Sequence, residues 1–223
     1  MFQFFLQVDS VKTASLGKIA STWDLLSKGG PLMIPLGILF VLGLFFFIER
    51  LIAIRKASKF EDNFMHIIRD HVVTGNITAA RSLAKNTDNP VARMIDKGLQ
   101  RIGKPIDQIE RSMDNVGELE MYKMEKNLSI LSVISRIAPL FGFIGTIIGL
   151  VLLLKEFAAI GNPTISQIAD AMYIKLITSA TGLVIGLLCF LGHSYLDTMI
   201  NKTANRMEAA SNDFIDILQE PTK

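Results

Sequence analysis

Three long apolar stretches without any Asp, Glu, Lys or Arg most constrain what this chain can fold into. They cover residues 31–48, 137–154 and 176–196. A helix needs about 20 such residues to cross a bilayer. The alternative is a soluble domain, which would need three buried helices that are apolar all round within only 223 residues. The sequence therefore predicts an all-α integral membrane protein with three transmembrane helices.

The polar residues between these stretches predict how the chain is organised. We expect a periplasmic or interfacial segment at 1–30, transmembrane helices at 31–54, 128–155 and 174–197, a cytoplasmic helical domain at 55–127, a short periplasmic link at 156–173 and a cytoplasmic C-terminal helix at 198–223. The start of the chain lacks the basic residues that precede the core of a signal peptide, so we expect the first span to be retained.

The predicted cytoplasmic domain reads as several amphipathic helices. One contains Val91, Met94, Ile95, Gly98, Leu99 and Ile102, which recur at intervals of three and four. Asn76 and Asn89 (or Asp88) are typical helix N-caps, and Pro90 fits a first-turn position. Between Asp107 and Arg136 the only helix breaker is Gly117, which predicts one long helix that continues out of the second span.

The distribution of Lys and Arg predicts the orientation, because these residues collect in cytoplasmic loops. They are frequent after the first stretch, before the second and after the third: Arg50, Arg55, Lys56, Lys59, Lys123, Lys126, Arg136, Lys202 and Arg206. The link at 156–173 has only Lys155 before it and Lys175 after it. We therefore expect the large loop and the C-terminus to be cytoplasmic, and the N-terminus and the link to be periplasmic.

Small residues lie on one face of the second span. On a helical wheel this face carries Ala138, Gly142, Gly145, Thr146 and Gly149, and Pro139 lies beside it. Glycine is costly in an ordinary helix, at about 1 kcal/mol per position. In a membrane, however, small residues let another helix approach closely. The face therefore predicts helix packing or the lining of a pore.

The third span repeats this pattern with more polar groups. Its small-residue face carries Lys175, Thr178, Ser179, Gly182, Gly186, Cys189 and His193. Lys175 lies near the end of the span, where a lysine can extend its charge to the membrane surface. The alternative is that Lys175 pairs with an acidic group.

The hydroxyl groups of Thr146, Thr178 and Ser179 are the candidate ion-pathway residues, together with Lys175. A hydroxyl both donates and accepts hydrogen bonds, so it can line a path for protons. Thr146 could instead bond only a carbonyl of its own helix. The apolar stretches 137–154 and 176–196 contain no carboxylate. If protons move here, we expect a second protein to supply the acid.

The residues quoted so far resemble a known family. The sequence APLFGFIGTIIGL at 138–150 resembles the second-span motif A-P-L-x-G-x-x-G-T-x-x-G of the MotA/TolQ/ExbB proton-channel family, ExbB/TolQ branch. TSATGLVIG at 178–186 resembles the third-span motif T-A-x-G-L. The first span and parts of the large loop are similar as well. The resemblance covers about residues 27–205.

This resemblance implies a function that the residue pattern alone does not give. Family members form pentameric rings in the bacterial inner membrane around ExbD-like single-span partners, whose aspartate takes up and releases protons. In the ExbB case a TonB protein transmits force to outer-membrane transporters. The matching hydroxyl positions here are Thr146 and Ser179. We therefore expect a homopentameric proton-channel subunit of the inner membrane.

Two departures from the family pattern affect these expectations. Ser179 occupies a position where the family usually has threonine, but the hydroxyl is kept. Many members carry a glutamate in the third span where this chain has Ile174, next to Lys175. We therefore expect Lys175 to pair with an acidic group of a partner or a neighbouring subunit.

Other function classes fit less well. A net charge of +2 gives no reason to expect nucleic-acid binding. The chain has one cysteine, Cys189, and scattered histidines, so we expect no metal site and no cofactor. Phosphate-loop and nucleophile-elbow motifs are absent, so we expect no enzyme. A TolQ-like subunit of the Tol envelope-maintenance motor and a passive membrane scaffold remain the alternatives.

Overall fold

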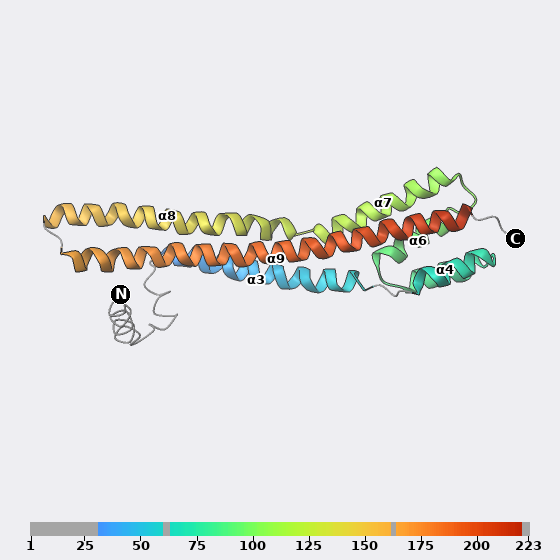
Figure 1. Cartoon of the computed structure of the whole chain (residues 1–223), viewed down its shortest axis with the longest axis horizontal. Coiled ribbons are helices and arrows are strands. Elements are labelled where there is room, and N and C mark those ends of the chain that lie inside the picture. The colour runs from blue at the N-terminus through green and yellow to red at the C-terminus, as the bar shows by residue number, and fades with distance from the viewer. Residues whose placement is uncertain (1–30, 60–62, 162–163, 220–223) are drawn as a thin grey trace, which may run out of the picture. The chain divides into compact units, whose positions relative to one another are not determined.

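The computed structural model describes residues 31–59, 63–161 and 164–219, and these residues form helices joined by short turns. Seven helices follow one another: α3 (Met33–Ala57), α4 (Phe64–Val73), α5 (Ile77–Asn86), α6 (Pro90–Leu99), α7 (Ile106–Glu125), α8 (Leu128–Ile160) and α9 (Ile165–Gln219) (Figure 1). The predicted segment at 1–30 lies outside the described residues. The all-helical prediction is confirmed.

Three of these helices are long and apolar enough to cross a membrane, and they contain the three stretches that the sequence predicts. Their lipid-compatible surface is extensive: Phe45, Ile144 and Leu187 are each at least 46% exposed. Since water would oppose such exposure at about 25 cal/mol per Å² of apolar surface, the natural surroundings of these helices are lipid or other spans. The chain is a multi-pass membrane protein with three candidate spans.

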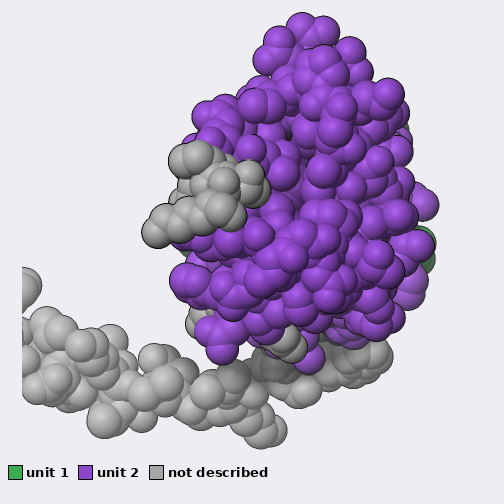
Figure 2. Space-filling model, turned by 90° about the vertical axis from the view of Figure 1, so that its right-hand side faces the viewer, with its two compact units in different colours: residues 1–41, 134–188 green, residues 42–133, 189–223 purple. Residues whose placement is uncertain are grey.

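The described residues form two compact units, which we treat separately (Figure 2). Unit 1 contains the described residues up to Val41 together with Ile134–Leu188. Unit 2 contains Leu42–Val133 together with Cys189 and the residues after it. Unit 1 therefore holds the apolar parts of α8 and α9, and unit 2 holds α4 to α7.

The helices of unit 2 begin where the sequence predicts. The Asn76 side chain accepts a hydrogen bond from the Ala79 amide at 3.2 Å, and Asn89 accepts one from the Ala92 amide at 2.7 Å. Each cap satisfies an amide that has no partner inside its own helix. Pro90 occupies the first turn of α6, where the missing N–H costs nothing. The predicted caps are thereby confirmed.

The core of unit 2 lies around α6, whose apolar face is almost fully buried: Val91, Met94, Ile95 and Leu99 are each 2% exposed or less. Helix α9 covers this face with its C-terminal half, where Phe214 is fully buried. A Cβ on Gly98 would lie 2.6 Å from both Met113 Sδ and Phe214 Cε1. The predicted packing of the C-terminal helix onto the loop helices is confirmed.

The prediction of one continuous helix from Asp107 to Arg136 is wrong. Helix α7 ends at Glu125 and α8 begins at Leu128, because Asn127 adopts a left-handed conformation with φ 64°. Asparagine tolerates this conformation better than most residues. The break is held from α3: Asn127 Nδ2 donates to Glu49 Oε2 at 3.4 Å, and Arg50 Nη1 donates to the Lys123 carbonyl at 3.2 Å.

The link predicted at 156–173 is largely helical. Helix α8 runs on to Ile160 and α9 starts at Ile165, so few residues connect the two. Gly161, with φ 85°, ends α8, since a positive φ is easily adopted only by glycine. The helical continuation predicted after the third span is seen in α9, which runs without a break from Ile165 to Gln219.

Candidate functional site

The small-residue faces of α8 and α9 meet each other inside unit 1, and we call this contact the seam. At the closest approach to a backbone atom, a Cβ on Gly182 would lie 2.6 Å from the Ala138 carbonyl oxygen, and it would lie 2.9 Å from Gly142 Cα. One turn further along α9, a Cβ on Gly186 would lie 2.5 Å from Pro139 Cγ. These distances leave no room for any side chain. The glycines therefore allow the two backbones to touch (Figure 1).

The seam continues into polar residues towards the start of α9. A Cβ on Gly142 would lie 3.1 Å from Ser179 Cα, and one on Gly145 would lie 3.0 Å from Thr178 Cγ2. Thr178 is 2% exposed, whereas Ser179 keeps part of its surface open. Thr178 is therefore an inner residue of the seam, and Ser179 lies at its margin.

Thr146 bonds within its own helix. Its hydroxyl donates to the Phe143 carbonyl at 2.7 Å, and the side chain is half-buried. This is one of the two alternatives that the sequence leaves open. The hydroxyl oxygen can still accept a further hydrogen bond from another molecule. Thr181, a half-buried threonine of α9, behaves in the same way and donates to the Ile177 carbonyl at 2.9 Å.

The aliphatic chain of Lys175 lies across Gly149. A Cβ on Gly149 would be 2.3 Å from Lys175 Cδ and 2.7 Å from its Cε. Gly149 therefore forms a notch that holds the lysine stem, rather than a point of contact between two backbones. The helical wheel placed each residue on the small-residue face of its own span, but it could not show that the two meet.

The charge of Lys175 has no partner in the described part of the chain, where it forms no salt bridge. Gly149 precedes Lys155 by six residues, which places the notch about 9 Å inside the level of that charged residue. An isolated charge inside a bilayer costs at least about 3 kcal/mol. The two alternatives for Lys175, a charge that reaches the membrane surface and a charge that pairs with an acidic group, therefore both stay open.

The structure thus brings together nearly all the residues singled out in the sequence. Contacts across the seam involve Ala138, Pro139, Gly142, Gly145, Gly149, Lys175, Thr178, Ser179, Gly182 and Gly186. Thr146 lies on α8 next to Gly145 and bonds its own backbone. The faces pack against each other within one chain, an arrangement that the wheel analysis did not anticipate.

A cluster of charges in unit 2 was not predicted from the sequence. Arg93 Nη2 donates to Glu120 Oε2 at 2.6 Å, and Lys123 Nζ donates to Glu120 Oε1 at 2.7 Å. Burial of the Glu120 carboxylate opposes its ionisation, but the bonds from Arg93 and Lys123 outweigh burial, so the pKa of Glu120 lies below its ordinary value of 4.5. Glu120 therefore stays ionised at neutral pH and does not carry protons.

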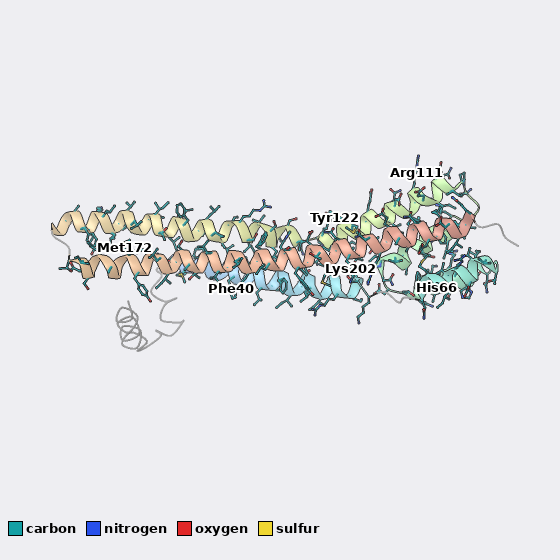
Figure 3. All side chains as sticks on the ribbon, viewed as in Figure 1. Phe40, His66, Arg111, Tyr122, Met172 and Lys202 are labelled. Atoms are coloured by element: carbon teal, nitrogen blue, oxygen red, sulfur yellow. The ribbon has the colours of Figure 1, made fainter. Side chains whose placement is uncertain are left out.

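Among the described residues, no three or more His, Cys, Asp and Glu side chains gather in a way that could hold a metal ion. His66 is exposed on α4 (Figure 3). The polar groups of the seam residues are hydroxyl groups and one ammonium group, which can bind and orient another molecule.

Comparisons with known proteins point to one family. A model of the MotA/TolQ/ExbB proton channel family matches residues 86–209, more than half of the chain and all of the seam. A putative biopolymer transport protein ExbB homolog of Methanothermobacter thermautotrophicus is 25% identical over 187 residues, which cover 83% of this chain and 66% of that protein. The biopolymer transport protein exbB1 of Vibrio cholerae is 30% identical over 94 residues, or 42% of this chain and 41% of that protein.

The chain covers less than two thirds of the length of each of these relatives. The family match is independent of them and includes α6 and α7, most of the polar C-terminal half of α9 and both helices of the seam. Its description is that of a proton channel, which is a transporter and not an enzyme. The chain belongs to the MotA/TolQ/ExbB proton channel family.

Proposed function

We propose that this chain is a ring-forming subunit of a proton channel in the bacterial inner membrane. With an ExbD-like single-span partner it would use the proton-motive force to energise TonB-dependent transport across the outer membrane. Its N-terminus would be periplasmic and its C-terminus cytoplasmic. The family membership and the names of the two relatives support this proposal.

The observation that carries the proposal is the chemistry of the seam. Thr146 and Ser179 are both half-buried, so each keeps part of its surface outside the contact between α8 and α9. The apolar stretches 137–154 and 176–196 contain no carboxylate, so the acid that takes up and releases the proton would come from a partner. A partner helix that brings an aspartate to these hydroxyls would complete the path.

The energy available to such a channel is sufficient. One charge that crosses 100 mV releases about 2.3 kcal/mol. Coupling between two sites of a protein typically amounts to about 1–3 kcal/mol. The passage of one to two protons therefore releases enough free energy for one conformational change in the assembly.

The test replaces the two hydroxyl side chains by apolar side chains of similar size, Thr146→Val and Ser179→Ala, in one protein. We expect transport driven by the proton gradient to be lost while the complex with the partner still assembles. The matched control is Thr181→Val, which removes a half-buried hydroxyl of α9 that bonds its own helix. Unchanged transport in the double variant would favour the passive scaffold, for which close packing of the seam is sufficient.

We also propose that Lys175 pairs with a carboxylate of the partner or of a neighbouring subunit. The lysine stem is fixed in the Gly149 notch and its charge has no salt bridge in the described residues. Charge reversal by Lys175→Glu should abolish transport, and a compensating change to lysine at the paired carboxylate, other than the aspartate that carries the proton, should restore part of it. Lys155→Met, at the exposed end of α8, is the matched control. Full activity of Lys175→Met would remove this part of the proposal.

The TonB and Tol systems differ in the partner that receives the force. We favour the TonB system because both relatives carry the name of ExbB. Deletion of the gene in its host distinguishes the two. Loss of TonB-dependent nutrient uptake with an intact envelope supports our proposal, whereas leakage of periplasmic proteins with normal uptake supports a Tol-type motor.

A further inference from the structure

One charged residue of α8, Arg136, has no role in the channel chemistry described so far. In the sequence it is one of the cations that precede the apolar stretch 137–154. The structure shows that α8 already begins at Leu128, and the eight residues 128–135 contain no Asp, Glu, Lys or Arg either. Arg136 is therefore an isolated charge within a long apolar helix.

Contacts within unit 1 give the depth of Arg136. The carbonyl oxygen of the preceding residue, Ser135, would lie 2.9 Å from a Cβ on Gly186, and Pro139 contacts the same glycine. Gly186 is the middle residue of the charge-free stretch 176–196 and lies ten residues from either end. Ten residues of helix are about 15 Å long, which is about half the thickness of the hydrocarbon core. Arg136 therefore lies near the middle of the membrane that α9 would span.

The side chain of Arg136 is too short to carry its charge out of the membrane from this depth. With bonds of about 1.5 Å, an extended arginine side chain is only about 7 Å long. Charged residues inside a bilayer are costly, and they usually face the interior of an assembly or pair with an opposite charge. Arg136 is exposed, and it forms no salt bridge or hydrogen bond with any residue that the structure describes. Its position therefore calls for a negative group from another molecule.

The depth of Arg136 limits which molecule can supply that group. A second copy of this chain does not, because the stretches 31–48, 137–154 and 176–196 contain no Asp or Glu. A lipid phosphate lies at the edge of the hydrocarbon core, beyond the reach of the side chain. A carboxylate on a membrane segment of a different protein fits best, since a guanidinium group binds a carboxylate through two parallel N–H···O bonds.

The face of α8 that carries Arg136 is an unoccupied surface suited to another helix. Four residues recur at intervals of four, three and four and so lie on one side of α8: Arg136, Leu140, Phe143 and Ile147. We call these four residues the arginine stripe. Its three apolar members are 58%, 59% and 46% exposed, respectively. Thr146 is next to Ile147 in the chain, so the stripe runs beside this candidate ion-pathway residue.

We propose that a membrane helix of the partner protein lies along the arginine stripe and pairs a carboxylate with Arg136. Apolar side chains of that helix contact Leu140 and Phe143. Thr146 is ten residues from Arg136, or about 15 Å along α8. A partner helix that also brings the proton-carrying acid to Thr146 therefore carries a second carboxylate about ten residues away from that acid. The proposal deepens the proposed function and rests on it for the presence of a second membrane protein.

The test measures how much partner stays bound to the full chain. The tagged chain and the ExbD-like protein of the same organism are produced together and purified in nanodiscs, and the partner is quantified per chain by mass spectrometry. We expect Arg136→Met to retain at least tenfold less partner than the wild type. The matched control, Arg55→Met, removes an exposed cation of α3 outside the stretch 31–48 and should retain an amount within twofold of the wild type.

The Arg136→Met variant should still insert and fold. It replaces a charge inside the membrane by an apolar side chain, so the chain produced without the partner should reach at least the yield of the wild type. Slow reaction of the buried Cys189 with a maleimide verifies the fold. A fall in that yield would overturn the proposal, because Arg136 would then serve the fold of the chain itself.

Exchange of the two charges identifies the paired carboxylate. Arg136→Glu should lose the partner as Arg136→Met does. Each Asp and Glu of the partner's membrane segment is then replaced in turn by lysine. We expect one of these changes to raise the amount of partner bound to Arg136→Glu at least tenfold. Failure of every such change to restore binding would contradict the pairing.

Other outcomes separate this proposal from its alternatives. Unchanged partner content in Arg136→Met, with a loss of bound anionic lipid, would mean that Arg136 binds a lipid phosphate and would overturn the pairing. Unchanged content, with transport still blocked by Thr146→Val and Ser179→Ala, would overturn the pairing and leave the proposed function in place. Absence of the partner even from the wild type would contradict the proposed function, and the pairing with it.

Discussion

Replacement of Gly182 by alanine is the most direct test of the seam. The new Cβ would lie 2.6 Å from the Ala138 carbonyl oxygen, about 0.8 Å short of an ordinary contact of 3.4 Å. It would also lie 2.9 Å from Gly142 Cα. Both neighbours are backbone atoms of α8, so no side chain can rotate away. The two helices would therefore have to separate.

The size of the effect follows from a comparison with Gly37→Ala in α3, where a Cβ would meet nothing within 4 Å. Both substitutions gain about the same helix propensity, up to about 1 kcal/mol. The difference between them isolates the cost of overpacking, which is typically about 1–3 kcal/mol. Because the clash at Gly182 is with backbone, we expect a difference of about 2–3 kcal/mol, with Gly182→Ala less stable.

The single cysteine of the chain provides the assay. Cys189 is 6% exposed in the folded protein, so it should react slowly with a maleimide until the helices separate. Its labelling is followed in mixed micelles as the mole fraction of SDS rises, for the wild type and both variants. We expect labelling of Gly182→Ala to reach its midpoint at a lower mole fraction of SDS than in the wild type. For Gly37→Ala we expect the midpoint at the same or a higher mole fraction. Equal midpoints for the two variants would refute the close contact of the seam.

Three further predictions concern unit 2. The pKa of Glu120 is lowered in the folded protein, so its bond to Arg93 stabilises the fold above the ordinary pKa of 4.5. This stabilisation is lost as the pH falls through the folded-state pKa. The Glu120→Gln variant should therefore lose less of its melting temperature than the wild type as the pH is lowered. Asn127→Ala should cost about 1–2 kcal/mol in thermal unfolding, since alanine disfavours a positive φ, whereas Asn127→Gly should cost less. Asn89→Ala should cost about 1 kcal/mol or more, and clearly more than Asn76→Ala at the exposed cap of α5, as measured by the same unfolding.

Local signals in the sequence predicted much of the fold. The three spans follow from the absence of charges over about 20 residues, and Asn76 and Asn89 are caps because a short polar side chain can reach an amide two or three residues on. The break at Asn127 could not be predicted in this way. It depends on Glu49 and Arg50, which are more than 70 residues away in the chain.

The faces of the spans were also predictable, but their partners were not. A helical wheel uses only the period of one helix, and it assigned Gly142, Gly182 and Lys175 to small-residue faces correctly. Which surface each face contacts depends on the tertiary fold. Within one chain these faces contact each other, and Gly149 accommodates a lysine stem instead of a backbone. The role of Thr146 and Ser179 in an ion path remains a proposal.

The unbroken course of α9 has a mechanical consequence. A helix of 55 residues is about 80 Å long and is held along its whole length by consecutive backbone hydrogen bonds. Within unit 1, a twist applied near Lys175 can therefore pass along α9 as far as Leu188. On α8 the same twist would stop at Asn127, where the ladder of bonds is interrupted. The two helical segments that leave the seam therefore differ: the backbone hydrogen bonds of α9 are continuous, whereas those of α7 and α8 are interrupted at Asn127.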